Sequence, residues 1–289
     1  MIKNLIIRTI SGAVFISVMI AAIWFPPYLF GAVFLLITVL GLREFYMLCD
    51  NIEGVKISKV LSVISGMMLF LALYSFSLPF AHRNLGFFGS FLALYFLCAI
   101  TLFLLELFRK QKNPIQNIAI SLMGHIYVAL PFGLLCMMES QNKIFLLAFF
   151  LIIWASDTGA YITGISIGKH KMFERISPKK TWEGFFGGMV FALIVGFIFY
   201  TTNTKELELI PTVEYFKYYN LLELWQWLAF ALIVFIFGTL GDLVESMFKR
   251  SLNVKDSGSF MPGHGGLLDR FDSAIIAAPV AFVFLMLCS

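Results

Sequence analysis

Charge is scarce in this chain. Only 13% of its 289 residues are Asp, Glu, Lys or Arg, while 60% are hydrophobic. Soluble globular domains carry about 25% charged and about 45–50% apolar residues, so this composition excludes a water-soluble domain. It also excludes an intrinsically disordered chain, which needs high charge and low hydrophobicity. The composition predicts an all-α, polytopic integral membrane protein.

Cysteine is rare as well. The four cysteines, Cys49, Cys98, Cys136 and Cys288, lie in or at the ends of apolar runs and show no C-x-x-C spacing. This excludes a disulfide-stapled secreted fold and gives no zinc-ligand pattern, so we interpret these residues as small apolar packing groups. The nucleotide-binding loops G-x-x-x-x-G-K-[ST] and G-x-G-x-x-G are absent too.

Long apolar runs, by contrast, are abundant. A bilayer core of about 30 Å needs about 20 apolar residues per helix, and this criterion predicts about nine spans. They are Ile10–Phe25, Tyr28–Leu48, Val60–Phe76, Leu85–Phe108, Ile118–Met138, Ile144–Gly168, Phe185–Thr202, Leu224–Phe248 and Phe271–Cys288. The first resembles a signal peptide, but Pro26-Pro27 replaces a small-residue cleavage site, so we expect an uncleaved helix in a tight hairpin. No linker or repeat is visible, and we expect one membrane domain over residues 1–289.

The basic residues are distributed unequally between the two sides of these spans. All but four of the 21 Lys and Arg residues fall on the side of the N-terminus; the exceptions are Arg83, Lys143, Lys205 and Lys217. Basic loops stay in the cytoplasm. The pattern therefore predicts a cytoplasmic N-terminus and an external C-terminus.

A few acidic residues lie inside the predicted spans, where an ionisable group is costly and usually functional. Asp157 falls near the middle of the sixth span, and Asp242 and Glu245 fall in the inner part of the eighth. The alternative for Asp157 is a structural acid paired with a neighbouring helix. Nearby, Gly164-x-x-x-Gly168 would admit a ligand or form a helix-packing face, and the two readings are compatible.

The densest polar stretch runs from Gly241 to Asp272. Helical spacing places Asp242, Ser246 and Lys249 on one face, with Glu245 beside them. Asp269 and Asp272 lie one turn apart at the start of the ninth helix. Two helices joined by a glycine-rich loop therefore bring several carboxylates to the inner membrane boundary.

This mixture of side chains suits phosphate chemistry. Carboxylates from separate helices suit Mg²⁺ together with substrate phosphates, and lysines, arginines and glycine-rich N–H groups suit phosphate oxygens. The combination indicates phosphoryl or nucleotidyl transfer. The alternative for Lys249 and Arg250 is that they anchor the helix to anionic lipid.

A second basic cluster, residues 177–184, contains Lys179 and Lys180. An ordinary cytoplasmic loop would account for these lysines but not for the uninterrupted run of polar and aromatic residues around them. We expect Ser177-Pro178 to form a turn and Thr181 to cap the seventh span.

The pattern Ser246-x-Phe248-Lys249-Arg250-x4-Lys255-Asp256-x-Gly258-x3-Pro262-x-His264-Gly265-Gly266-Leu267-x-Asp269-Arg270-Phe271-Asp272 resembles the signature of phosphatidate cytidylyltransferases, also called CDP-diacylglycerol synthases. Met261 is a mild departure that stays apolar. Ser177–Gly184 and Asp157–Tyr161 resemble the family too. The similarity covers about residues 145–289, whereas the first five spans match only in being hydrophobic. Residues 1–143 would then be N-terminal spans of weak resemblance, and 144–289 the catalytic spans and cytoplasmic loops.

The resemblance implies a reaction of CTP with phosphatidic acid that gives CDP-diacylglycerol and pyrophosphate in phospholipid biosynthesis. It implies Mg²⁺, a second cation such as K⁺, and a homodimer. The enzyme would lie among the lipids of the plasma (inner) membrane with its active site facing the cytoplasm, and nucleic acid is not an expected partner.

The resemblance also implies residue roles. Asp242 and Asp269 map onto paired metal-binding aspartates, and together with Lys249 and Asp272 they form the expected catalytic set. His264 is expected to position substrate and not to abstract a proton. The expected substrate-binding residues are Lys179, Lys180, Ser246, Arg250, Lys255, Asp256, His264, Gly265, Gly266, Arg270 and Asp157.

Two other functions compete with this one. A different membrane lipid phosphotransferase of the CDP-alcohol type should carry the pattern D-G-x2-A-R-x8-G-x3-D-x3-D, which is absent. An ion-coupled transporter should concentrate its charges at the membrane midplane, where only Asp157 falls.

Overall fold

The computed structural model describes residues 2–78, 85–204, 222–258 and 265–288. Within these ranges eight helices are long and apolar enough to cross a membrane, and Gly12–Trp24 is a shorter apolar helix. The prediction of an all-α polytopic membrane protein is therefore confirmed, and Gly12–Trp24 is the C-terminal part of the longer helix α1 (Ile2–Trp24).

The helices begin and end within a few residues of the predicted spans, except that the first begins eight residues earlier. They are α1 (Ile2–Trp24), α2 (Pro27–Cys49), α3 (Lys59–Ser77), α4 (Leu85–Arg109), α5 (Pro114–Gly124), α6 (Leu130–Gln141), α7 (Lys143–Ile167), α8 (Trp182–Thr204), α9 (Leu224–Ser251) and α10 (Leu268–Cys288).

The fifth predicted span is one membrane crossing with an interruption. Between α5 and α6, His125–Ala129 form a π-helical turn called η2. Pro131 follows in the first turn of α6. A proline inside a helix has no N–H to donate and clashes with the carbonyl four residues before it, and the wider π-turn accommodates this proline without ending the span.

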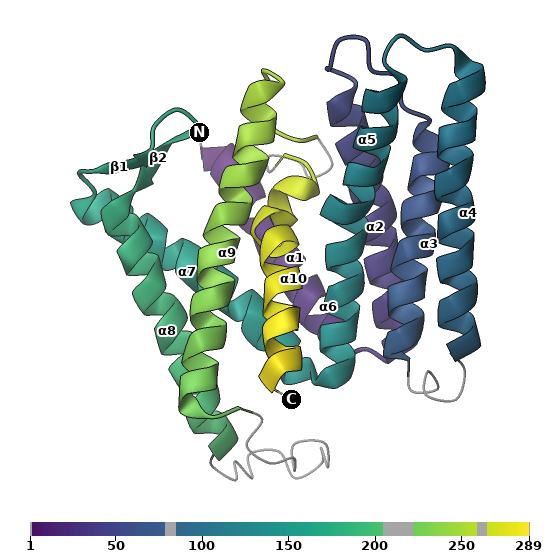
Figure 1. Cartoon of the computed structure of the whole chain (residues 1–289). Coiled ribbons are helices and arrows are strands. Elements are labelled where there is room, and N and C mark those ends of the chain that lie inside the picture. The colour runs from purple at the N-terminus through teal and green to yellow at the C-terminus, as the bar shows by residue number, and fades with distance from the viewer. Residues whose placement is uncertain (1, 79–84, 205–221, 259–264, 289) are drawn as a thin grey trace.

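The helices are arranged in two groups around a central set (Figure 1). α2, α3, α4 and α5 lie on one side and α7, α8 and α9 on the other, with α1, α6 and α10 between them. The N-terminus and the strands lie at one end of the bundle and the C-terminus at the other. The sequence predicts this separation of the termini, because it gives an odd number of spans.

A short antiparallel hairpin joins α7 to α8. Its strands are β1 (Lys171–Phe173) and β2 (Ser177–Thr181), with Lys171 opposite Thr181 and Phe173 opposite Ser177. The predicted turn at Ser177-Pro178 is wrong, because these residues begin β2 and the turn lies at 174–176. Proline is tolerated there since both strands of a two-stranded ribbon are edges. The predicted cap is confirmed: Gly184 N donates to Thr181 Oγ1 over 3.2 Å.

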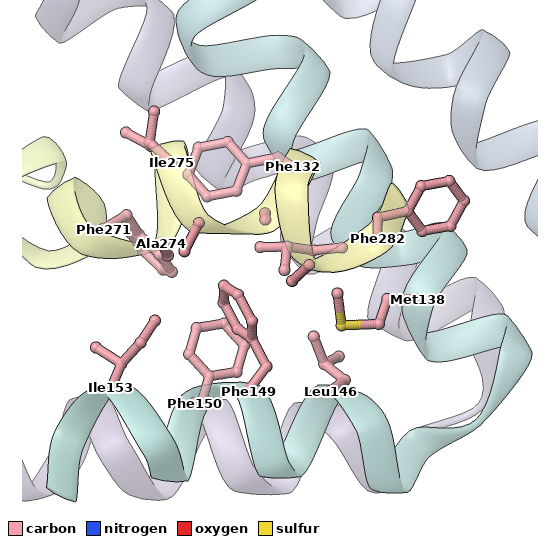
Figure 2. Close-up of a cluster of buried hydrophobic side chains, with 14 of the residues drawn as sticks. Phe132, Met138, Leu146, Phe149, Phe150, Ile153, Phe271, Ala274, Ile275 and Phe282 are labelled. Carbon is pink, nitrogen blue, oxygen red and sulfur yellow. The ribbon is translucent and has the colours of Figure 1, made fainter. Parts of the chain in front are cut away.

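One part of the buried core lies where α6, α7 and α10 meet. Phe149 and Phe150 of α7 face Phe271 of α10 and Phe132 of α6, and all four are 3% exposed or less (Figure 2). The rings of Phe132 and Phe271 pack edge to face with centroids 5.1 Å apart. This packing fixes α10, which begins at the polar end of the bundle, against the two helices beside it.

α9 and α10 approach closely at Gly241. A Cβ atom at this position would lie 2.5 Å from the carbonyl oxygen of Asp272, whereas a Cβ at Gly238, one turn earlier, would lie 3.6 Å from Ser273 Cβ. Only the first distance forces the helices apart. Gly241 therefore sets the spacing between Asp242 on α9 and Asp272 on α10.

Gly241→Ala should destabilise the protein by about 1–3 kcal/mol, the usual cost of overpacking a tight contact. Gly238→Ala, in ordinary contact distance, should cost little and is the matched control. Thermal unfolding of both purified variants in detergent checks this. Equal midpoints for the two variants would contradict the close approach.

Candidate active site

A cavity of about 800 Å³ opens among α1, α7, α8, α9, α10 and the hairpin. Its charged wall contains seven residues that the sequence singled out. They are Asp157, Lys179, Lys180, Asp242, Asp269, Arg270 and Asp272. Residues from α7, β2, α9 and α10, separated by as many as 115 positions, thus meet at one place.

The remaining wall of this cavity is largely apolar. Phe15 and Ile16 of α1 line it together with Trp154, Tyr161 and Ile165 of α7. Tyr161 and Ile165 are each 69% exposed, so their side chains also form part of the outer surface of α7. The cavity therefore combines a charged wall with an apolar one that reaches the outer surface of the bundle.

Three carboxylates of the charged wall act on one another. The negative charges of Asp157, Asp242 and Asp272 repel. Lys180 offsets part of this charge, since its Nζ lies 2.8 Å from Asp242 Oδ2. Ser246 donates to Asp242 Oδ1 over 3.2 Å, which confirms that these two residues share a helix face.

Asp157 is open to the cavity and makes no salt bridge within the described part of the chain. A structural pairing with a neighbouring helix is therefore not observed. Gly164 has a double position: it lines the cavity, and the place of its missing Cβ lies 3.3 Å from Thr181 Oγ1. The same Cβ would lie 3.8 Å from Gly184 Cα of α8, so the helix-packing reading is observed for Gly164, while the admission of a ligand stays a prediction.

Lys249 lies behind the cavity wall and is only 11% exposed. Its Nζ is 3.2 Å from Oε1 of the buried Glu245 and 2.5 Å from Oδ1 of Asp269, whose side chain is 9% exposed. A lysine held between these two carboxylates does not reach the lipid surface. The structure therefore argues against the alternative that Lys249 anchors the helix to anionic lipid. Arg250 is exposed and contacts the hairpin, where its Nε donates to Ile176 O over 3.5 Å.

Asp269 is the most highly bonded acid of the site. Its Oδ2 accepts from Ser257 N over 2.9 Å and from Gly266 N over 2.8 Å, in addition to the contact of Oδ1 with Lys249. Gly265 has φ +85°, and a Cβ there would lie 2.6 Å from Asp269 Oδ2. Glycine is required at this position because other residues rarely adopt that backbone conformation.

Some predicted residues lie away from the cavity. Lys255 and Asp256 are exposed on the loop after α9 and do not line it. The prediction for His264 falls outside the described residues. Conversely, sequence reasoning missed Glu44 and Ser257, which bond to each other and hold the start of α10. The one signal for Glu44 was an acidic residue near the C-terminal end of the second predicted span.

The donor set fits a hard cation that arrives with a phosphate ligand. In the described ranges, no three His, Cys, Asp or Glu side chains are arranged as a ready-made metal cage. Mg²⁺ commonly takes only one or two carboxylates, with substrate phosphates and water completing its shell. Mutually repelling carboxylates that line one cavity meet that requirement.

The sequence comparisons define the class of protein. The family model described as "Cytidylyltransferase family" matches residues 6–288. The chain is 36% identical over 253 residues to a phosphatidate cytidylyltransferase of Staphylococcus haemolyticus, covering 87% of each chain. It is 35% identical over 275 residues to that of Staphylococcus saprophyticus, covering 94% of this chain and 97% of the relative. The chain belongs to the phosphatidate cytidylyltransferase family, whose members are nucleotidyltransferases.

These matches correct one expectation. The resemblance was expected to stop near residue 145, but the family match begins at residue 6 and includes the first five spans. The family resemblance of the first five spans was missed because apolar residues substitute for one another freely, so no single position in these spans is distinctive. Family membership also sets aside the transporter and the CDP-alcohol phosphotransferase as alternatives.

Lys249→Met should lower stability by about 3–5 kcal/mol, because it leaves Glu245 and Asp269 buried without their cation. Lys255→Met, at an exposed lysine of the next loop, should leave the unfolding midpoint nearly unchanged. Thermal unfolding without substrates measures both. An unchanged midpoint for Lys249→Met would show that the buried ion pairs contribute nothing to the fold.

Proposed function

We propose that this protein transfers the cytidylyl group of CTP to phosphatidate and releases pyrophosphate, giving CDP-diacylglycerol. The observation that carries the proposal is the cavity with a charged wall and an apolar wall that reaches the outer surface of the bundle at α7. Phosphatidate needs the charged wall for its phosphate and the apolar wall for its acyl chains, whereas the triphosphate of CTP needs the charged wall. Family membership supports the same reaction.

In the proposed step, an oxygen of the phosphatidate phosphate attacks the α-phosphorus of CTP. The bond from this phosphorus to the oxygen that bridges to the β-phosphorus breaks, and pyrophosphate leaves with that electron pair. Phosphatidate is already ionised at neutral pH, so the step needs no strong general base. Catalysis then depends on holding the two anions together and neutralising their charge.

The basic residues have distinct proposed roles. Lys179 and Lys180 of the hairpin would bind the leaving pyrophosphate, since both line the cavity. Arg250 and Lys255, neither of which lines the cavity, would bind a part of the triphosphate or of the phosphatidate headgroup that extends beyond it. Lys249 would act from behind, by holding Asp269 in place through the 2.5 Å contact.

The acidic residues would hold the metal. Asp242 and Asp269 would bind Mg²⁺, with Ser246 and Asp272 supporting them, and the cation would supply positive charge at the α-phosphate. Asp242 is the more available of the two because only Lys180 and Ser246 contact its carboxylate in the described chain. Asp157 would bind substrate from α7, where the charged wall meets the apolar one. A second cation such as K⁺ and a homodimer remain part of the proposal.

The site is proposed to face the cytoplasm, where CTP is available. Both β strands and the start of α10 lie at the end of the bundle where the N-terminus lies (Figure 1). That end carries the loops in which most of the basic residues fall, and such loops stay in the cytoplasm. In this orientation the nucleotide enters from water and the lipid enters sideways along α7.

The purified protein, given CTP, Mg²⁺ and phosphatidate, should release pyrophosphate. Asp242→Asn should abolish this turnover and leave the unfolding midpoint nearly unchanged, because it removes the charge with little change of shape. Asp269→Asn should also abolish turnover, at some cost in stability since Asp269 is bonded to Lys249. Glu53→Gln, an exposed acid on the loop after α2, is the control. Substantial turnover by folded Asp242→Asn would overturn the metal assignment.

Sealed membrane vesicles test the orientation, because CTP does not cross a bilayer. Inside-out vesicles should convert phosphatidate when CTP is added outside, whereas right-side-out vesicles should do so only after detergent opens them. Turnover by sealed right-side-out vesicles alone would reverse the proposed sidedness.

A further inference from the structure

Glu44 connects the N-terminal spans to the loop that precedes α10. Its Oε1 accepts from the Ser257 hydroxyl and, over 2.9 Å, from Leu268 N; its Oε2 accepts from Leu267 N over 2.8 Å. These partners lie more than 210 positions away in the sequence. One carboxylate of α2 thus binds two backbone N–H groups at the start of α10 and one side chain of the loop.

Two glycines, Gly258 and Gly266, leave room for the Glu44 carboxylate. A Cβ on Gly258 would lie 2.9 Å from Glu44 Cδ, and a Cβ on Gly266 would collide with Glu44 Oε1. Both glycines are therefore needed for the approach. Leu267 directly precedes α10 and Leu268 is its first residue, so their N–H groups lack partners within the helix. A negative charge near a helix N-terminus is stabilising.

Ser257 links Glu44 to Asp269 by hydrogen bonds to both residues. Its hydroxyl donates to Glu44 and accepts from Asp269 N over 3.3 Å, and its own N–H donates to Asp269 Oδ2 over 2.9 Å. Glu44 therefore fixes both the residue that bonds the Asp269 side chain and the helix turn on which Asp269 lies. Glu44 itself does not line the cavity.

We propose that Glu44 is a positioning residue for the transfer reaction: through Ser257 and the start of α10 it holds Asp269 in its working orientation. This assignment rests on the proposed role of Asp269 in catalysis. It gives the second span a specific chemical part in a site whose charged residues all lie more than 110 positions later. A purely structural clamp is the competing explanation, and it predicts lost stability without a selective effect on turnover.

The test compares Glu44→Gln with Glu53→Gln, the same change at an exposed acid. In Glu44→Gln, one carboxylate oxygen that accepts from a backbone N–H is replaced by an NH₂ group, which is itself a donor and cannot accept that hydrogen bond. The kcat of Glu44→Gln should fall roughly ten- to hundredfold, as for other residues that orient ligands of a reacting group. Hydrogen exchange should become faster at Leu267 and Leu268 and stay unchanged in α3 and α4. Glu53→Gln should match the wild-type protein in both measurements.

Ser257→Ala provides the second arm and keeps the test decisive if Glu44→Gln does not fold. It should lower kcat and speed hydrogen exchange at Leu267 and Leu268. In the double variant, the logarithm of kcat should fall by less than the sum of the two single decreases, because both residues act through one contact. Wild-type kcat in a folded Glu44→Gln protein would overturn the proposal. So would a fall accompanied by faster exchange in every helix. If the wild-type protein released no pyrophosphate, the proposed function would fail, while the exchange data would still report whether Glu44 orders the loop.

Discussion

The salt bridge between Lys249 and Asp269 is the contact on which the polar end of the bundle depends. It joins α9 to α10, and it lies where both partners are about nine-tenths buried. In such surroundings a charge without a partner is far more costly than in water. The shared lysine also bonds Glu245, so separating the two helices would leave three buried charges poorly satisfied. The relative position of α9 and α10 is therefore tightly constrained at this level.

That constraint explains how carboxylates can be brought together against their own repulsion. Asp242 and Asp272 lie on the helices that Lys249 and Gly241 hold in close contact, and Asp157 faces them from α7. Lys180 is bound to Asp242 alone among these acids in the described part of the chain. Under the proposed function, this excess of negative charge is useful, because it favours a cation that in turn attracts the phosphates of CTP. The cost of assembling the acids is met by the surrounding fold before the substrates bind.

The features predicted from sequence were those that local spacing controls. The apolar runs gave the spans, helical periodicity placed Asp242 and Ser246 on one face, and Thr181 was identified as a helix cap. The hairpin was missed because serine and proline are typical of turns, and nothing local shows that Ser177-Pro178 pairs as a strand. Glu44 was missed for a different reason: its partners lie more than 210 positions away, and no local pattern contains information about them.

The N-terminal spans show why a site can extend beyond its motif. Phe15 and Ile16 of α1 form part of the cavity wall, and the Phe15 and Phe271 rings pack 5.4 Å apart next to Asp272. An apolar wall needs only side chains of suitable volume, so many sequences satisfy it and none becomes a recognisable signature. A carboxylate that must accept from two backbone N–H groups and a hydroxyl has no such freedom. The sequence motif of this protein therefore contains residues that have strict chemical requirements and also lie close together in the sequence. Glu44 has a strict chemical requirement but lies far from the motif in the sequence.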